Sequence, residues 1–119
     1  MSDLKPVFVA LRAVMAPYGA RLVVKRDTDD EYYVETARVA ENGKPGFFGA
    51  VQVKRAFVSY HLMPVYTHPE LLEGVSDGLR ARMHGKSCFN FKEVDPALFN
   101  ELAGLTERGY AVIGAADHS

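Results

Sequence analysis

Four runs rich in β-branched and aromatic residues constrain the fold of this chain more than any other feature. They cover residues 21–26, 31–39, 46–54 and 56–66. Such residues are favoured in strands, because their side chains pack well on a pleated surface. Turn formers separate the runs: the acidic stretch 27–30 is typical of a hairpin turn, and ENGKPG (41–46) indicates a strand connection. The pattern predicts two antiparallel strand pairs, and SCFNFK (87–92) indicates one more strand.

Helical periodicity brackets these strands. Near the N-terminus, apolar residues recur at intervals of three and four, which places them on one helical face. They are Leu4, Val7, Phe8, Leu11, Val14, Met15 and Tyr18. Pro17 and Gly19 are expected to end this helix. Near the C-terminus, Asp95 is expected to cap a helix that Pro96 opens. Its buried stripe would be Leu98, Phe99, Leu102 and Leu105.

Two short helices are predicted between the fourth and fifth strands. The first would begin at Pro69 and end at Gly74, and the second would be capped by Ser76 and end at Gly85. The order is therefore helix, four strands, short helices, strand and helix. This order predicts an α+β fold: an antiparallel sheet of about five strands with helices packed on one face.

Composition limits the architecture and the partners. A chain of 119 residues with 48% hydrophobic content can bury one core but not two, so we expect one domain over residues 1–119. With 14 basic and 15 acidic residues, no global field favours nucleic acid. No apolar run reaches the ~20 residues that cross a bilayer, and the N-terminus is not expected to be a signal peptide. A lone cysteine fits a reducing compartment, so the expected location is cytoplasmic.

The segment HGKSC (84–88) resembles a phosphate-binding loop, but its context differs. Such a loop needs a glycine five residues before the Gly-Lys pair, and position 80 is arginine. It also needs a following helix whose amides hold the phosphates, whereas a strand is predicted here. We therefore expect no nucleotide binding of this kind.

Chemistry at Cys88 has two interpretations. A nucleophilic thiolate needs a base or cation nearby, and His61 or His84 would be the candidate bases of a small Cys/His enzyme. No nucleophile signature surrounds Cys88, so we expect an inert buried thiol and assign no catalytic residue.

Metal and anion ligands follow no recognisable spacing. Helical His-to-His spacing and Cys-x-x-Cys pairs are both absent from the sequence, so no metal ligand is predicted and the cofactor stays unknown. The acidic turn at 27–31 is expected to be solvated. The basic residues Arg80, Arg82, Lys86 and Lys92 would either bind an anion or complement a helix C-terminus, and we expect the second.

Strand alternation separates two faces of the sheet. The helices would cover the face with Val51, Val53, Val58, Tyr60, Leu62, Phe89 and Phe91. The second face would carry Phe48, Gln52, Phe57, Ser59, His61, Met63, Cys88 and Asn90. A mixture of aromatic and small polar groups suits an enclosed surface. Three alternatives stay open: a ligand cleft, a homodimer interface, or a minor core covered by residues 109–116. The tentative ligand-binding residues are Gln52, Ser59, His61, Cys88 and Asn90.

Two segments resemble the YdhG-like family, a bacterial family of unknown function. They are GKPGFFGAVQVKRAFVSYHLMPVY and PELLEGVSDGLRARMHGKSCFNFKEVDPALFNEL. The resemblance implies the fold, and some members are described as frataxin-like iron chaperones, which implies acidic residues along the first helix and strand. Residues 4–18 contain no Asp or Glu, so this chain departs from that pattern. The leading prediction is a non-enzymatic binding module for a small ligand or for self-association, and iron or other metal delivery is the alternative.

Overall fold

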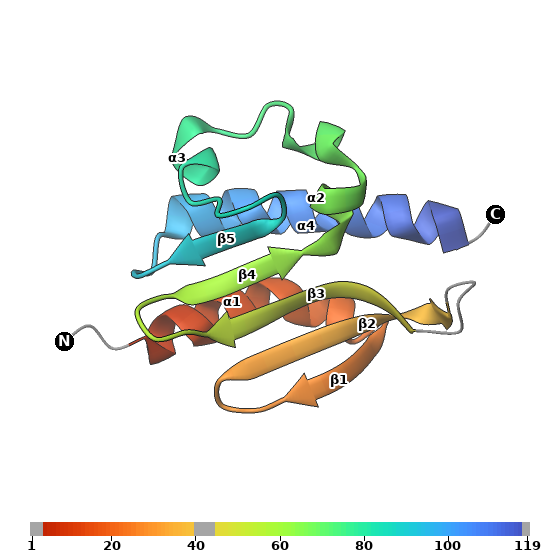
Figure 1. Ribbon diagram of the computed structural model, residues 1–119, viewed down its shortest axis with the longest axis horizontal. Coiled ribbons are helices and arrows are strands. Elements are labelled where there is room, and N and C mark those ends of the chain that lie inside the picture. Colours follow the sequence, from red (N-terminus) through yellow and green to blue (C-terminus); the bar gives the residue numbers. More distant parts are fainter. Residues whose placement is uncertain (1–3, 40–44, 118–119) are drawn as a thin grey trace.

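The computed structural model describes residues 4–39 and 45–117, which form one antiparallel sheet and its helices (Figure 1). The strands are β1 (Val23–Asp27), β2 (Glu31–Val39), β3 (Pro45–Val53), β4 (Val58–Leu62) and β5 (Cys88–Phe91). The helices are α1 (Lys5–Gly19), α2 (Met63–Thr67), the 3-10 helix η1 (Pro69–Leu72), α3 (Asp77–Arg80) and α4 (Pro96–Asp117). The strands are neighbours in chain order, from β1 to β5. The predicted α+β class is confirmed.

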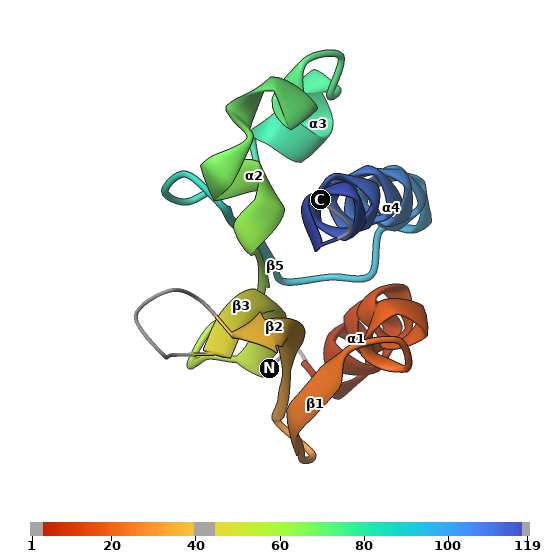
Figure 2. The ribbon, with the colours of Figure 1, turned by 90° about the vertical axis from the view of Figure 1, so that its right-hand side faces the viewer.

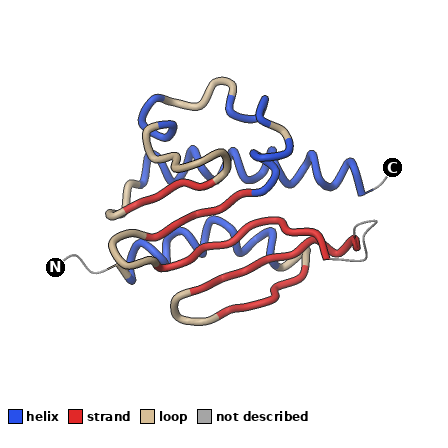
Figure 3. Tube along the Cα trace, in the orientation of Figure 1, coloured by secondary structure: helices blue, strands red, loops and turns tan. Residues whose placement is uncertain are grey.

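The two long helices lie side by side on the same face of the sheet. Figure 2 shows α1 and α4 together on one side, and Figure 3 shows strands of the sheet passing in front of α1. The short helices between β4 and β5 pack against α4 beyond the edge of the sheet. Helices therefore cover one face, as the sequence predicted.

The core fills the space between the sheet and the two long helices. Val51, Tyr60 and Phe89 form one row across β3, β4 and β5, and all three are fully buried. Leu11 of α1 and Leu102 of α4 are also fully buried and pack in the same cluster. Apart from Val53, which is partly exposed at the edge of the core, the predicted helix-facing residues are buried.

Local signals set several element boundaries as predicted. The Asp95 carboxylate accepts a hydrogen bond from the Leu98 amide at 3.1 Å, and α4 begins at Pro96. The Ser76 hydroxyl accepts one from the Leu79 amide at 3.2 Å and caps α3. Side-chain acceptors at these positions satisfy amides that have no partner inside the helix.

The predicted end of the first helix is confirmed at Gly19 but not at Pro17, and the predicted end of the fourth strand is wrong. Pro17 lies inside the last turn of α1, which continues to Gly19, because a proline there removes only one helical hydrogen bond. Residues 63–66 were expected to continue the fourth strand but belong to α2. Pro64 has no amide hydrogen to donate to a neighbouring strand. In the first turn of a helix an amide hydrogen has no acceptor within the helix, so a proline is tolerated there.

Two further boundaries differ from the expected ones. The first strand begins at Val23 rather than at residue 21, and α3 ends at Arg80 rather than near Gly85. The predicted connection ENGKPG lies mostly outside the described residues, which resume at Pro45 with β3.

Candidate functional site

The sheet face opposite α1 and α4 carries the candidate site, and we call it the open face. Two rows cross the strands on this face. One row is Arg26, Tyr33, Ala50, His61 and Cys88, and the other is Glu31, Gln52, Ser59 and Asn90. All five tentative ligand-binding residues lie in these rows, as adjacent cross-strand partners. Figure 2 shows both long helices on the other side of the sheet.

The prediction that Phe48 lies on this face is wrong. Val34 pairs with Gly49 while the next residue, Glu35, pairs with Phe47, so β3 carries one extra residue there. Such a bulge reverses the alternation of side chains beyond it. Phe48 is therefore fully buried on the helix side, and Phe47 takes its place on the open face.

Of the other expected members of the face, Met63 lies elsewhere and Phe57 lies at the margin. Met63 belongs to α2 because the fourth strand ends at Leu62. Phe57 lies in the turn between β3 and β4, at the margin of the open face, where it lines a hollow described below.

The minor-core alternative is also wrong as stated. The segment 109–116 is part of α4, which covers the opposite face. Gly109 approaches Pro64 and Leu62 on the helix side, and the Tyr110 ring lies against Phe48. The open face is thus not covered by this segment.

An aromatic cluster occupies one part of the open face. The Tyr33 and Phe47 rings stack with centroids 4.9 Å apart, and the Phe47 ring meets the His61 ring edge-on at 4.9 Å. His61 Nε2 lies 2.8 Å from the Ser87 hydroxyl. Partial burial lowers the pKa of His61, which favours the neutral imidazole. The cluster offers flat apolar surface beside a neutral ring nitrogen.

Small side chains form the floor between the strands. Ala50 and Ser59 are only 2% and 7% exposed, although no helix covers them. Their larger cross-strand neighbours, among them Gln52 and His61, therefore shield them. Ala50 and Ser59 are thus nearly buried on the open face.

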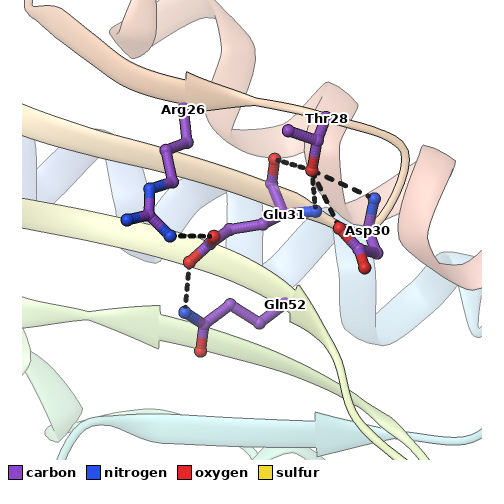
Figure 4. A network of polar contacts seen from close by, with 5 residues as sticks. All are labelled: Arg26, Thr28, Asp30, Glu31 and Gln52. Carbon is purple, nitrogen blue, oxygen red and sulfur yellow. Dashed lines mark hydrogen bonds and ion pairs between the residues drawn. The ribbon is translucent and has the colours of Figure 1, made fainter.

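A polar network occupies the part of the open face nearest to β1 (Figure 4). Gln52 Nε2 donates to the Glu31 carboxylate at 2.6 Å, and the Arg26 guanidinium donates to it at 3.1 Å. The hydrogen bond from Gln52 and then that from Arg26 lower the pKa of Glu31. Both partners favour the charged carboxylate and orient it across the strands.

The acidic turn at 27–31 is held by partners of its own. Arg12 of α1 makes two hydrogen bonds with the Asp27 carboxylate, at 3.0 and 2.7 Å. The Thr28 hydroxyl donates to Asp30 at 2.8 Å and accepts from the Glu31 amide at 3.0 Å (Figure 4). These carboxylates support the hairpin. Within residues 4–39 and 45–117, no group of three or more His, Cys, Asp or Glu residues is placed to hold a metal.

Two hollows lie at opposite margins of the open face. The first, of about 290 Å³, is lined by Lys25, Arg26, Glu31, Tyr33 and Glu35. The second, of about 230 Å³, has Phe57, Arg82, His84, Asn90 and Lys92 among its lining residues, and we call it the basic hollow. Tyr33 and Glu31 were not among the predicted site residues, although alternation in EYYVE (31–35) places both on the face opposite Tyr32 and Val34.

The HGKSC segment forms the turn that leads into β5. Ser87 is buried and bonded to His61, Cys88 is half-buried beside His61, and the Lys86 ammonium lies 5.9 Å from the centre of the Tyr66 ring. Of the basic run, Arg80 donates to the Leu72 carbonyl at 2.7 Å. Arg80 and Lys86 thus lie in separate surroundings, whereas Arg82 and Lys92 both line the basic hollow.

Comparison with protein-family models, curated proteins and solved structures finds no match to this chain. The YdhG-like resemblance stays a prediction. Over the part of the chain that the structure describes, no helix has the length and apolar character needed to cross a membrane.

Proposed function

We propose that this chain is a cytosolic, non-enzymatic binding module whose open face holds a small ligand with a planar ring. One observation supports this most strongly: the Tyr33 ring stacks on Phe47, whose ring meets His61, in the row where the small, nearly buried Ala50 lies between Tyr33 and His61. Ring surfaces beside a few directed polar groups are typical of small-molecule sites.

The polar row supplies the groups that would orient the ligand. Gln52 and Asn90 each carry an amide next to Ser59 in the row across β3, β4 and β5. An amide can donate and accept, and the carbonyl side of Gln52 is left to accept while its nitrogen bonds Glu31. A planar ligand resting on the aromatic cluster would therefore find hydrogen-bond partners along one edge.

Self-association through this face is the competing possibility, and charge argues against it. A second copy on the open face would cover Arg26 and Glu31, whose ion pair is partly exposed to water. Burying charged groups carries a desolvation penalty that their mutual attraction often fails to offset. A small ligand can use the aromatic cluster and leave these charges hydrated.

A nuclear magnetic resonance titration with indole, a neutral planar probe, tests the proposal. Indole should shift the amide signals of Tyr33, Ala50 and His61. Phe47→Ala should weaken binding about tenfold, because an aromatic contact contributes roughly 0.5–1.5 kcal/mol beyond its buried area. Tyr66→Ala is the matched control, since Tyr66 is an exposed aromatic residue of α2 outside the open face.

The contradicting outcomes are specific. If indole shifts no amide signal of the open face, the proposed ring site is wrong. It is also wrong if Tyr66→Ala weakens indole binding as much as Phe47→Ala does. Analytical ultracentrifugation of the ligand-free protein tests self-association. A concentration-dependent dimer that Phe47→Ala dissociates would show that the open face serves self-association.

A further inference from the structure

The segment 82–84 extends the open face beyond β5. The Asn90 amide donates to the Arg82 carbonyl at 2.8 Å, and the His84 amide donates to the Cys88 carbonyl at 2.9 Å. Met83 forms an antiparallel bridge with Phe89 and packs against the core. Arg82 and His84 flank Met83, and all three line the basic hollow at this margin of the open face.

Lys92, which directly follows β5, lines the same hollow. Phe91 is buried on the helix side, so its neighbours Asn90 and Lys92 are directed toward the open face. Both line the basic hollow together with Arg82 and His84. Four polar or basic residues from these two neighbouring stretches thus line one hollow of about 230 Å³, together with Phe57, Ala81 and Met83.

In the described part of the chain, no carboxylate lies within ion-pair distance of the basic side chains of this hollow. Among the described residues, no hydrogen bond or ion pair joins the side chain of Arg82, His84 or Lys92 to another group. Glu93 and Asp95 line a separate hollow that Arg82 and Lys92 also border, yet neither carboxylate lies within ion-pair distance of them. Asp95 is engaged instead as the cap of α4.

From this arrangement we infer that the basic hollow binds the oxyanion group, a phosphate or a carboxylate, of the ligand held on the open face. The inference rests on the proposed function and names the chemical class of its ligand. Arg82 supplies a planar guanidinium that can hold two oxygens, and Lys92 supplies a compact charge. The Asn90 amide adds a neutral donor, and the Phe57 ring forms an apolar wall that strengthens charge interactions by excluding water.

The spacing of the strands relates this group to the ring site. His61 of β4 pairs with Cys88 of β5, and Cys88 lies beside His84 in the added segment. Two strand spacings of about 4.8 Å separate His61 from the added segment, and Asn90 lies about 7 Å further along β5 than Cys88, so the oxyanion group would lie roughly 12 Å from the aromatic cluster. The ligand is therefore a small ring compound with an acidic group at its far end, rather than a bare ion.

Titrations with inorganic phosphate and with benzoate, at constant ionic strength, test this inference beside the indole titration. Each anion should shift the amide signals of residues 82–84 and 90–92. Arg82→Gln and Lys92→Gln should each weaken anion binding about tenfold, since each removes a charge-assisted hydrogen bond, and should leave indole binding unchanged. Lys86→Gln is the matched control, because it removes one positive charge from the same stretch of chain outside the hollow.

The two proposals fail in different ways. Anion shifts that are lost in Arg82→Gln support the inference even where indole does not bind, and that result overturns only the ring site. An anion that shifts no amide near Arg82 overturns the inference, whatever indole does. Equal weakening by Lys86→Gln also overturns it, since it would indicate a general charge effect. Tighter binding of phosphate assigns a phosphate group to the ligand, and tighter binding of benzoate assigns a carboxylate.

Discussion

The phenol oxygen of Tyr60 and the hydroxyl oxygen of Thr106 lie 2.7 Å apart in the core, although 46 residues separate them in the chain. The Thr106 hydroxyl donates to the Leu102 carbonyl at 2.8 Å, so its own proton is engaged. Tyr60 must therefore donate to Thr106. Burial raises the pKa of Tyr60 well above its usual value, which keeps the phenol neutral and able to donate.

This direction of donation predicts unequal effects of removing either hydroxyl. Thr106→Val leaves the Tyr60 phenol buried without an acceptor, which should lower the free energy of unfolding by about 1–3 kcal/mol. Tyr60→Phe leaves Thr106 still bonded to Leu102 and should lower it by roughly 0.5–1.5 kcal/mol. Urea denaturation of both single variants and the double variant measures the difference. If Tyr60→Phe proved the more damaging change, the assigned direction would be wrong.

Truncation of the fully buried side chains tests the core. Leu11→Ala, Phe89→Ala and Leu102→Ala should each lower the free energy of unfolding by about 2–5 kcal/mol, because each leaves a cavity between the sheet and the helices. Val9→Ala on the same helix as Leu11 is the control, since its side chain is 55% exposed, and should change stability by less than about 0.5 kcal/mol. Thermal melts equal to that of the parent for all three core variants would disprove the core assignment.

Two glycines should respond to alanine with opposite sign. A Cβ at Gly49 would lie 2.6 Å from the Met15 methyl carbon and 2.7 Å from the His61 carbonyl oxygen, and the carbonyl belongs to the neighbouring strand. Gly49→Ala should therefore destabilise the fold by about 1–3 kcal/mol. In α4, a Cβ at Gly104 meets only the Arg108 side chain at 3.6 Å, so Gly104→Ala should stabilise by up to about 1 kcal/mol. Opposite shifts in melting temperature would confirm both; shifts of the same sign would contradict one of them.

The half-buried His61 predicts a pH dependence near neutrality. Burial lowers its pKa in the folded protein below the value of 6.5 that it regains on unfolding. Below pH 6.5 the unfolded chain binds the proton of His61 more readily than the folded protein does. The contribution of neutral His61 to the free energy of unfolding is therefore fully present above pH 6.5 and is lost as the pH falls toward the pKa of the folded protein. Carboxylates with lowered pKa values, such as Glu31 and Glu101, act in a separate range below about pH 4.5.

Urea midpoints at pH 5.5 and pH 7.5 test this prediction. The parent should be less stable at the lower pH, and His61→Gln should reduce the difference because glutamine does not titrate. An unchanged difference in the variant would assign the pH dependence to another group.

Much of the fold could be predicted from the sequence because the deciding interactions are local. The caps at Ser76 and Asp95 satisfy amides three residues away, so residue type and spacing identify them. Apolar periodicity identified α1 and α4, and alternation identified the helix-facing residues of β4 and β5, because each pattern follows from the geometry of a single element.

Only the tertiary structure decided which side chains meet on the open face. Alternation predicts a face correctly only while pairing is regular, and the extra residue at Phe48 exchanges the places of Phe47 and Phe48. A bulge depends on how β2 and β3 pair, and residues within β3 do not reveal it. The basic hollow has the same origin: Arg82 and Lys92 are ten positions apart, and they line one hollow because residues 82–84 fold back along β5. Such long-range pairing is a property of the assembled sheet, so no local pattern in the sequence predicts it.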